Sequence, residues 1–386
     1  MARRVFVHIG TPKSGTTVLQ SVMFENRHAL ARAGLTVPAL RPDSQFRAVV
    51  DLLGIDYAGW QDPLTAGAWD AVATAARAAP GDAVISHEML MRADDAQVER
   101  AVESLRPAEV HVLVTVRHLA RQVGSTWQEN LRNGQVEEWD AFEAAVIGRP
   151  GAAPGLAEVF WAHQDYPAAL ARWTRHVPPE NVHVVGLVPG GELWHDVARV
   201  FGVDPDVATA PAVAGVNRSL GMQQAELLRL VNLRLRDRIG FREYSTVVKF
   251  LLAMEVLGEQ DDPRPIRLAP DAFAALSERH DGFLAAARAA GYHVDDRLDA
   301  LDPGVPAGPA DRAAVSDALP GLTLGADVLA DFIVKMVEEH YEVDPVGKLR
   351  RAALDLVEVR PAARRALQAY LRAKHAVGRY RTPPAA

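Results

Sequence analysis

Short apolar runs alternate with longer segments of helical periodicity along the first half of the chain. The apolar runs are rich in branched residues, which is typical of buried strands. They span residues 4–10, 82–88, 109–117 and 181–187. Apolar residues at three- and four-residue spacing predict helices over residues 16–33, 66–79, 96–105, 119–133 and 167–176. This alternation predicts an α/β fold, in which helices flank a mostly parallel sheet and ligands bind beyond the carboxyl ends of the strands.

The pattern changes after about residue 210. Helical periodicity then dominates, over residues 219–236, 244–258, 270–290, 324–342 and 345–377. A stretch rich in proline, glycine and alanine at residues 302–321 predicts a linker. We therefore expect an α/β core over residues 1–215 and a mostly helical C-terminal region over residues 216–386. No chemical signature stands out in the last third, so its helices are expected to form a structural layer or a homodimer interface.

Composition narrows the function classes. The chain has 386 residues, no cysteine and a formal net charge of −7. Disulfides, thiolate metal sites and cysteine nucleophiles are therefore excluded, and the negative charge argues against a general nucleic-acid binder. No apolar run approaches the roughly 20 residues of a membrane-spanning helix. A soluble, cytoplasmic protein is the expectation.

The first apolar run leads into the sequence HIGTPKSGTTVLQ, which begins at His8. Two glycines have the spacing of a Walker A loop, but Lys13 lies inside the loop and a threonine follows Gly15 where the Walker lysine would stand. The helix start offers backbone N–H groups to an anion, and hydroxyls and one ammonium group surround it. The candidate anion-binding residues are Thr11, Pro12, Lys13, Ser14, Gly15, Thr16 and Thr17.

This loop closely resembles the 5′-phosphosulfate loop of sulfotransferases that use 3′-phosphoadenosine 5′-phosphosulfate (PAPS), especially bacterial and carbohydrate-type members. The resemblance covers roughly the first 220 residues. It implies a P-loop-like sulfotransferase fold, with PAPS as the co-substrate and adenosine 3′,5′-bisphosphate as the product. It also implies that Lys13 contacts the sulfated end of the donor, while the hydroxyls and amides of the loop hold the 5′-phosphate. No metal is required by such a site, because the lysine, the amides and the helix dipole offset the charge.

A second anion motif follows the third predicted strand. Arg117 stands at the carboxyl end of this strand, and Ser125 follows eight residues later on the next predicted helix. The pair resembles the family motif that binds the 3′-phosphate, and a guanidinium suits a phosphate well. Arg121 lies between the two residues and is expected to be an exposed helical arginine.

A third segment, VNRSLG at residues 216–221, resembles a bacterial family sequence that leads into a helix. In related sulfotransferases a late loop covers the 3′-phosphate and the adenine. The resemblance therefore makes Asn217, Arg218 and Ser219 candidates for donor binding. Ser219 has an equally good alternative role as the cap of the following helix.

The general base is expected at the end of the second predicted strand, in the sequence VISHEML. The resemblance favours Glu88, because a glutamate at this place is the base in carbohydrate-type and many bacterial sulfotransferases. His87 is the rival, since histidine serves in another branch and titrates near neutral pH. Adjacent strand residues point to opposite faces, so only one of the two is expected to face the acceptor.

Two other functions fit the pattern less well. A P-loop kinase or NTPase would need a lysine after Gly15 and a magnesium-binding aspartate at the end of the third strand, where Arg117 stands instead. A non-catalytic nucleotide-binding scaffold would be expected to lose at least one of four side chains: Lys13, Glu88, Arg117 or Ser125. The acceptor is left open among small-molecule and glycan hydroxyls, such as a sugar, a lipid-linked glycan, a phenol or a secondary metabolite.

Overall fold

The computed structural model describes residues 1–39, 41–55, 65–188, 191–209, 219–236, 238–260 and 264–340. Two of the predicted donor-binding residues, Asn217 and Arg218, lie outside these ranges. The helix expected over residues 345–377 lies outside them as well.

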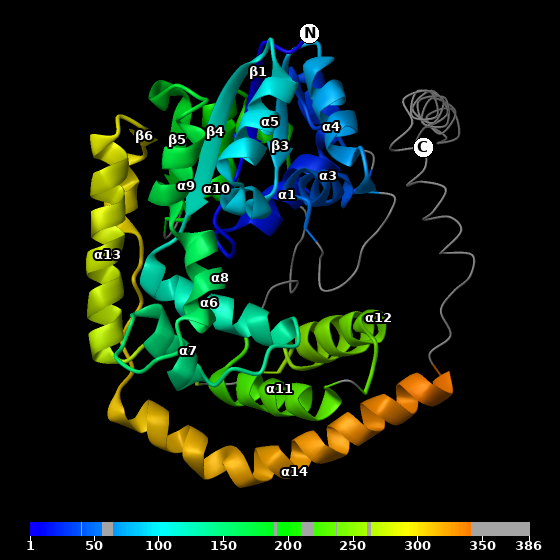
Figure 1. Ribbon diagram of the computed structural model, residues 1–386, viewed down its shortest axis with the longest axis vertical. Helices are drawn as coiled ribbons and strands as arrows, with labels where there is room; N and C mark the ends of the chain where they lie inside the picture. Colours follow the sequence, from blue (N-terminus) through cyan, green and yellow to red (C-terminus); the bar gives the residue numbers. More distant parts are fainter. Residues whose placement is uncertain are drawn as a thin grey trace, which may run out of the picture.

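A six-stranded parallel sheet forms the upper part of the molecule (Figure 1), with strand order β2-β3-β1-β4-β5-β6. The strands are β1 (Arg4–His8), β2 (Leu35–Thr36), β3 (Asp82–Ser86), β4 (Glu109–Val116), β5 (Val182–Gly186) and β6 (His293–Val294). All four predicted strands are confirmed. The two edge strands were not predicted, because two residues are too few to show a periodic pattern.

Helices cover both faces of the sheet, as predicted for an α/β fold. Side chains alternate along β1: Val5 and Val7 face one core, and Phe6 faces the other. The core around Phe6 is covered by α1 (Thr16–Glu25), α2 (Arg27–Arg32) and α10 (Leu193–Phe201). The opposite core is covered by α3 (Ser44–Leu53), α4 (Ala68–Arg77), α5 (Asp95–Leu105), α9 (Tyr166–Trp173) and the end of α13 (Pro270–Ala289).

A second, all-helical body lies beyond the carboxyl ends of the strands (Figure 1). It has its own buried cluster, with Trp127, Phe142 and Phe160 among its largest members. Its elements are α6 (Leu119–Arg132), α7 (Trp139–Val146), α8 (Gly155–Gln164), α11 (Met222–Leu235), α12 (Phe241–Glu243), the π-helix η5 (Tyr244–Val256) and α14 (Pro309–His340). Short 3₁₀ turns are η2 (Glu88–Arg92), η3 (Pro179–Asn181), η4 (Pro205–Val207) and η6 (Asp296–Ala300).

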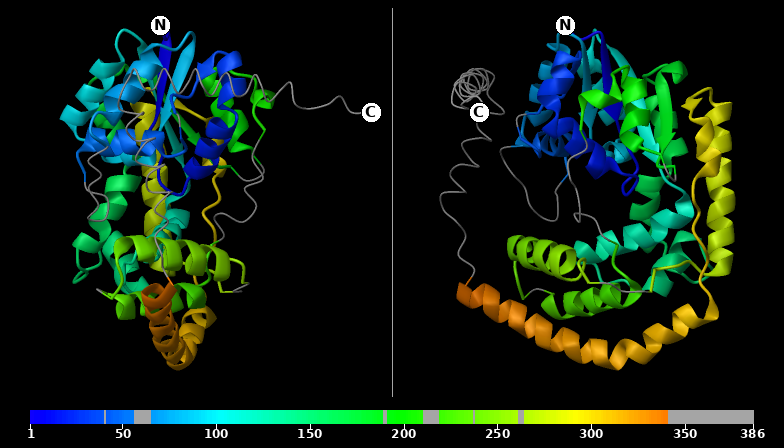
Figure 2. Two further views of the ribbon diagram at one scale, coloured as in Figure 1. Left: turned by 90° about the vertical axis from the view of Figure 1, so that its right-hand side faces the viewer. Right: turned by 180° about the vertical axis from the view of Figure 1, so that it is seen from behind.

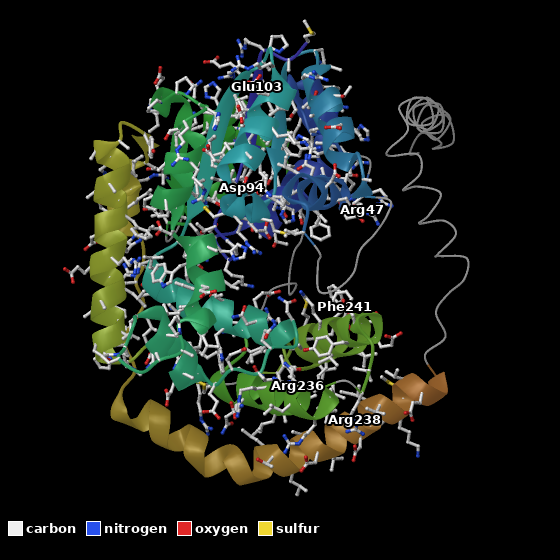
Figure 3. The ribbon with its side chains drawn as sticks, in the orientation of Figure 1. Arg47, Asp94, Glu103, Arg236, Arg238 and Phe241 are labelled. Atoms are coloured by element: carbon white, nitrogen blue, oxygen red, sulfur yellow. The ribbon has the colours of Figure 1, made fainter. Side chains whose placement is uncertain are left out.

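Helix α14 curves beneath α11 at the far end of this body (Figure 2). Arg234 pairs with Asp327, and Arg238 Nη2 donates to Asp331 Oδ1 at 2.8 Å. Figure 3 places Arg238 between α11 and α14, and it shows Phe241 at the start of α12. Phe241 is 43% exposed. These two ion pairs therefore add to the apolar packing of α14 on α11.

The linker expected over residues 302–321 differs from the structure in its second part. Residues 302–308 form no helix or strand, but α14 begins at Pro309. Proline is tolerated in the first turn of a helix, where its missing N–H costs no hydrogen bond, so the proline does not mark the end of regular structure here. The division into regions 1–215 and 216–386 stays a prediction.

Part of the C-terminal region nevertheless joins the sheet. Strand β6 pairs with β5, and Leu298 of η6 is only 1% exposed within the core that covers β1. A Cβ at Gly186 of β5 would collide with Leu298, so the two segments are in direct contact. Within the described ranges, no helix is long and apolar enough to cross a bilayer.

Leu298→Ala is expected to lower the free energy of unfolding by about 2–4 kcal/mol, because the variant loses buried methyl groups and leaves a cavity. Chemical denaturation followed by tryptophan fluorescence measures this change. The control is Leu251→Ala, at a position 44% exposed, which should cost less than about 0.5 kcal/mol. Equal effects of the two substitutions would contradict the place of η6 in the sheet core.

Candidate functional site

Three sequence motifs follow the carboxyl ends of three adjacent strands: the loop with Lys13, the segment with Glu88 and the segment with Arg117. Strand β1 is hydrogen-bonded to β3 on one side and to β4 on the other, with His8 opposite Ser86 and Leu113. The loop after β1 therefore lies between the segment that follows β3, with Glu88, and the segment that follows β4, with Arg117. The sheet thus brings together residues that are far apart in the sequence.

The loop between β1 and α1 has an unusual backbone. Gly10 and Gly15 have φ angles of 43° and 91°, and Lys13 has a φ of 67°. Among the described residues, Lys13 is the only one other than glycine with a positive φ. Such a conformation is strained for a residue with a side chain, and strain of this kind clusters at functional sites. Lys13 thus lies just before the point where the loop enters α1. The first backbone N–H groups of this helix, at Thr16 and Thr17, have no hydrogen-bond partners within the helix.

Thr115 of β4 fastens the loop to the sheet. The Thr115 carbonyl accepts two hydrogen bonds from Thr11, one from its backbone N–H at 2.8 Å and one from the Thr11 hydroxyl at 3.1 Å. The Thr115 hydroxyl contacts Ser14 Oγ at 2.8 Å and His8 Nε2 at 3.0 Å. Ser14 is fully buried, and its hydroxyl also donates to the Thr11 carbonyl at 2.6 Å. The Ser14 hydroxyl therefore braces the loop in this structure, and its predicted contact with an anion stays a prediction.

These contacts fix the direction of each hydrogen bond. Because the Ser14 proton goes to the Thr11 carbonyl, Thr115 donates to Ser14 and accepts from His8 Nε2–H. Burial lowers the pKa of His8 to about 4, so its imidazole is neutral near pH 7. Its Nδ1 then carries no proton and accepts from Ser86 Oγ at 2.7 Å. His8 is thus a satisfied core histidine, as expected from its position in the strand.

Two glutamines complete the support of the loop. Gln122 Nε2 donates to Thr11 Oγ1 at 3.2 Å and to the Pro12 carbonyl at 3.0 Å. Gln164 Nε2 donates to the same carbonyl at 3.3 Å. Helices α6 and α8 of the helical body therefore also hold the loop.

Lys13 forms an ion pair with a carboxylate of α6. Its Nζ lies 3.4 Å from Glu129 Oε2, and the other oxygen, Oε1, lies 3.1 Å from Nζ of Lys249 on η5. Arg132 Nη1 is 3.7 Å from Oε2. Burial lowers the pKa of Lys13, with smaller contributions from Arg132 and Lys249, whereas Glu129 raises it. The loop lysine thus stands in a half-buried, cation-rich group.

Arg117 and Ser125 are in contact. Arg117 Nη1 donates to Ser125 Oγ at 3.2 Å, and the serine hydroxyl donates to the Arg121 carbonyl at 3.1 Å. The Arg121 side chain is 42% exposed and pairs with Asp302, as suits the exposed arginine that was expected. The pKa of Arg117 is lowered by burial and by Arg121 and is raised by Asp302. The two residues of the second anion motif therefore form one group at the end of β4.

The two candidate bases have different surroundings. Glu88 Oε2 accepts from Gln20 Nε2 of α1 at 3.0 Å, and His87 Nδ1 lies 4.0 Å from the same oxygen. Burial raises the pKa of Glu88, but His87, a backbone N–H and Gln20 outweigh burial and hold it below its usual value. His87 Nδ1 instead accepts from the Met89 N–H at 3.2 Å and caps η2. Burial lowers the pKa of His87 as well, and the choice of Glu88 as the base stays a prediction.

Ser219, the candidate ligand of the third segment that lies within the described residues, is exposed and does not cap a helix. Helix α11 begins at Met222 with Gly221 as its N-cap, so the capping alternative is wrong. Leu220 N–H donates to Gln128 Oε1 of α6 at 2.8 Å, which anchors the segment beside the helix that carries Ser125.

Sequence reasoning missed the residues that hold the site together: Gln20, Thr115, Gln122, Glu129, Gln164 and Lys249. Glu129 and Arg132 have the three-residue spacing of a helical ion pair, which is a weak signal. Nothing in the sequence places Lys249 near Lys13, because that contact depends on tertiary packing. Among the described residues, no group of three or more His, Asp or Glu side chains could hold a metal ion.

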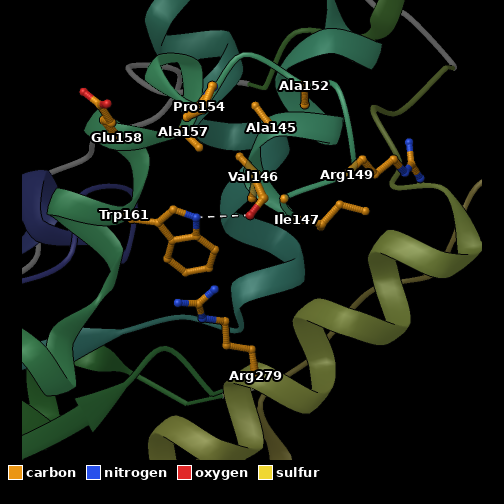
Figure 4. Close-up of a pocket in the computed structure, with 11 residues that line it drawn as sticks. Ala145, Val146, Ile147, Arg149, Ala152, Pro154, Ala157, Glu158, Trp161 and Arg279 are labelled. Atoms are coloured by element: carbon orange, nitrogen blue, oxygen red, sulfur yellow. Dashed lines mark hydrogen bonds between the residues drawn. The ribbon is translucent and has the colours of Figure 1, made fainter.

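A separate pocket of about 470 Å³ lies between α7, α8 and α13 (Figure 4). Trp161 Nε1 donates to the Val146 carbonyl at 3.1 Å, and the Arg279 guanidinium lies 3.7 Å from the ring centre of Trp161. None of the predicted site residues lines this pocket. It is therefore distinct from the edge of the sheet where the three motifs meet.

The comparisons with known proteins do not assign a function to this chain. No protein-family model and no curated protein sequence matches the chain. The chain is similar to the solved structure of a sulfotransferase from Alicyclobacillus acidocaldarius, with a TM-score of 0.41 and 14% identity. The similarity covers 75% of this chain and 96% of that one. A likeness at this level does not decide a function.

The buried His8 gives a testable pH dependence. The unfolded chain protonates His8 near pH 6.5, whereas the folded chain does so only near pH 4, so acidification through this window favours unfolding. His8→Gln should therefore lose less stability than the wild type between pH 7 and pH 5, by about 2 kcal/mol. Urea denaturation at the two pH values measures the difference. Equal losses would show that His8 is not held neutral by the network.

Proposed function

We propose that this protein is a PAPS-dependent sulfotransferase. The observation that carries the proposal is the pairing of two anion sites across neighbouring strands. The strained Lys13 loop and the start of α1 form one site at the end of β1, and the Arg117–Ser125 group forms the other at the end of β4. A donor with a 5′-phosphosulfate and a 3′-phosphate carries two separate anions, which suits this arrangement.

The residues have distinct roles in the proposed site. The N–H groups of the loop and of the first turn of α1 bind the 5′-phosphate, and Thr16 and Thr17 supply hydroxyls beside it. Arg117 and Ser125 bind the 3′-phosphate by charge-assisted hydrogen bonds. Asn217, Arg218 and Ser219 are proposed to cover the nucleotide. Thr11 and Pro12 shape the loop through the contacts with Thr115, Gln122 and Gln164.

The proposed reaction is a direct in-line transfer. The acceptor oxygen attacks the sulfur, a new O–S bond forms, and the bond between sulfur and the 5′-phosphate oxygen breaks. The electron pair of the broken bond stays on that phosphate oxygen, where Lys13 stabilises the charge, and adenosine 3′,5′-bisphosphate leaves. The acceptor proton passes to the Glu88 carboxylate. Gln20, which joins α1 to Glu88, orients the base relative to the loop.

A P-loop kinase is less well supported by the same geometry. The strand next to β1 ends at Val116 and is followed by Arg117, a cation, where a kinase of this type places a carboxylate for magnesium. The loop lysine also stands inside the loop and not at the start of the helix. Both features favour a ligand that needs no magnesium.

Calorimetric titration tests the donor assignment. The wild type should bind adenosine 3′,5′-bisphosphate without magnesium, and Arg117→Ala should weaken this binding at least about tenfold, because a charge-assisted hydrogen bond is lost. Arg121→Ala is the matched control, since Arg121 pairs with Asp302, and its effect should stay below about threefold. Preference for ATP with magnesium would overturn the proposal in favour of a kinase, and binding of neither nucleotide would favour a non-catalytic scaffold.

The role of Glu88 can be separated from donor binding. Glu88→Gln keeps the shape and the contact with Gln20 but cannot accept a proton, so transfer of ³⁵S from labelled PAPS to a panel of sugars and phenols should fall by about 10²–10⁴-fold. Affinity for adenosine 3′,5′-bisphosphate should be unchanged. His87→Asn should reduce transfer less than tenfold. A larger loss of sulfuryl transfer in His87→Asn than in Glu88→Gln would assign the base to His87.

A further inference from the structure

The C-terminal half of the chain places a second lysine beside the loop lysine. Lys249 Nζ donates to Glu129 Oε1 at 3.1 Å and to Asn133 Oδ1 at 2.7 Å. Lys13 Nζ donates to the other oxygen of the Glu129 carboxylate at 3.4 Å. One carboxylate therefore joins two ammonium groups that come from opposite halves of the chain.

The charges of this group do not balance. Within the part of the chain that the structure describes, Glu129 is the only carboxylate in an ion pair with either lysine. The side chains of Lys13 and Lys249 are only 23% and 21% exposed. Partly buried cations that outnumber their counter-ions are costly unless an anion joins them. The group is thus suited to receive an additional anion.

Lys249 lies on η5, which is π-helical. The buried residues of η5 are Val247, Val248, Leu252 and Ala253. They pack in the apolar core of the helical body, whereas Lys249 contacts Glu129 of α6. π-Helical turns are rare and recur at functional sites.

We propose that Lys249 is a second catalytic cation, which binds the sulfuryl group of the donor while Glu129 positions it beside Lys13. The inference rests on the proposed function. Lys13 stabilises the charge that develops on the leaving phosphate oxygen, and Lys249 binds the sulfuryl oxygens that the donor has and the product lacks. The helical region is then part of the donor site.

Two ligands that differ by the sulfuryl group test this role. Lys249→Met should weaken PAPS binding at least about tenfold in calorimetry, because a charge-assisted contact with the sulfuryl oxygens is lost. Its affinity for adenosine 3′,5′-bisphosphate should change less than about threefold, since that ligand has no sulfuryl group. Lys335→Met, which removes an exposed lysine of α14, is the matched control and should leave both affinities unchanged.

The pH dependence of PAPS binding tests whether Glu129 and Lys249 act on the charge of Lys13. The groups around Lys13 are Glu129, which raises its pKa, and Arg132 and Lys249, which lower it. In Glu129→Gln the pKa of Lys13 should fall, so PAPS binding should be lost at a lower pH than in the wild type. In Lys249→Met the pKa of Lys13 should rise, so the loss should move to higher pH.

The outcomes separate this inference from the proposed function. If the wild type binds neither PAPS nor the bisphosphate, the sulfotransferase proposal itself fails. If the wild type binds both and Lys249→Met behaves like Lys335→Met, only the role of Lys249 is overturned. Equal weakening of both ligands in Lys249→Met would also overturn it, because the effect would then not depend on the sulfuryl group.

Discussion

The hydrogen bonds of Thr115 hold the loop after β1 in the shape on which the site depends. This residue of β4 accepts from Thr11 at its carbonyl and joins His8 to Ser14 through its hydroxyl. The Ser14 hydroxyl donates its proton to the Thr11 carbonyl and accepts from Thr115, and burial keeps His8 neutral near pH 7. A loop that contains a lysine at a positive φ needs such external support, because its own backbone preferences disfavour that shape. The strain at Lys13 and the network at Thr115 are therefore two parts of one arrangement.

The order of strands in the parallel sheet places this loop between two other candidate segments. Since β1 lies between β3 and β4, the loop has the candidate base on one side and the Arg117–Ser125 group on the other. Helix α1 joins the loop to Glu88 through Gln20, and helix α6 carries both Ser125 and Glu129. The helical body supports the same edge through Gln122, Gln164 and Lys249. The proposed donor site, the candidate base and Glu129 are thus connected through elements that follow the ends of neighbouring strands.

The sequence predicts the parts of this structure that local patterns encode. The four longer strands are confirmed, and branched apolar runs such as VHVLVTV are typical of buried strands. The resemblance assigned Arg117 and Ser125 to one 3′-phosphate, and the structure brings the two side chains into contact. Strands β2 and β6 escaped prediction because each pairs over only two residues. The start of α14 was missed because Pro309 reads as a helix breaker, although it occupies the first turn.

The support of the site could not be predicted for a different reason. Ser14 looks like an anion ligand in the sequence, but its hydroxyl is turned toward Thr115, a neighbour that only the sheet register brings near. The contact of Glu129 with Lys249 depends on the packing of η5 against α6. Such contacts join residues far apart in the chain and leave no periodic trace in either segment.

A crystal structure of the protein with adenosine 3′,5′-bisphosphate tests the central claim most directly. The claim is that two anion sites, at the ends of β1 and β4, bind the two phosphates of one nucleotide. The structure should then show the 5′-phosphate on the loop of residues 11–17 and the 3′-phosphate on Arg117 and Ser125. A nucleotide bound elsewhere, or one with no phosphate on the Arg117–Ser125 group, would contradict the claim.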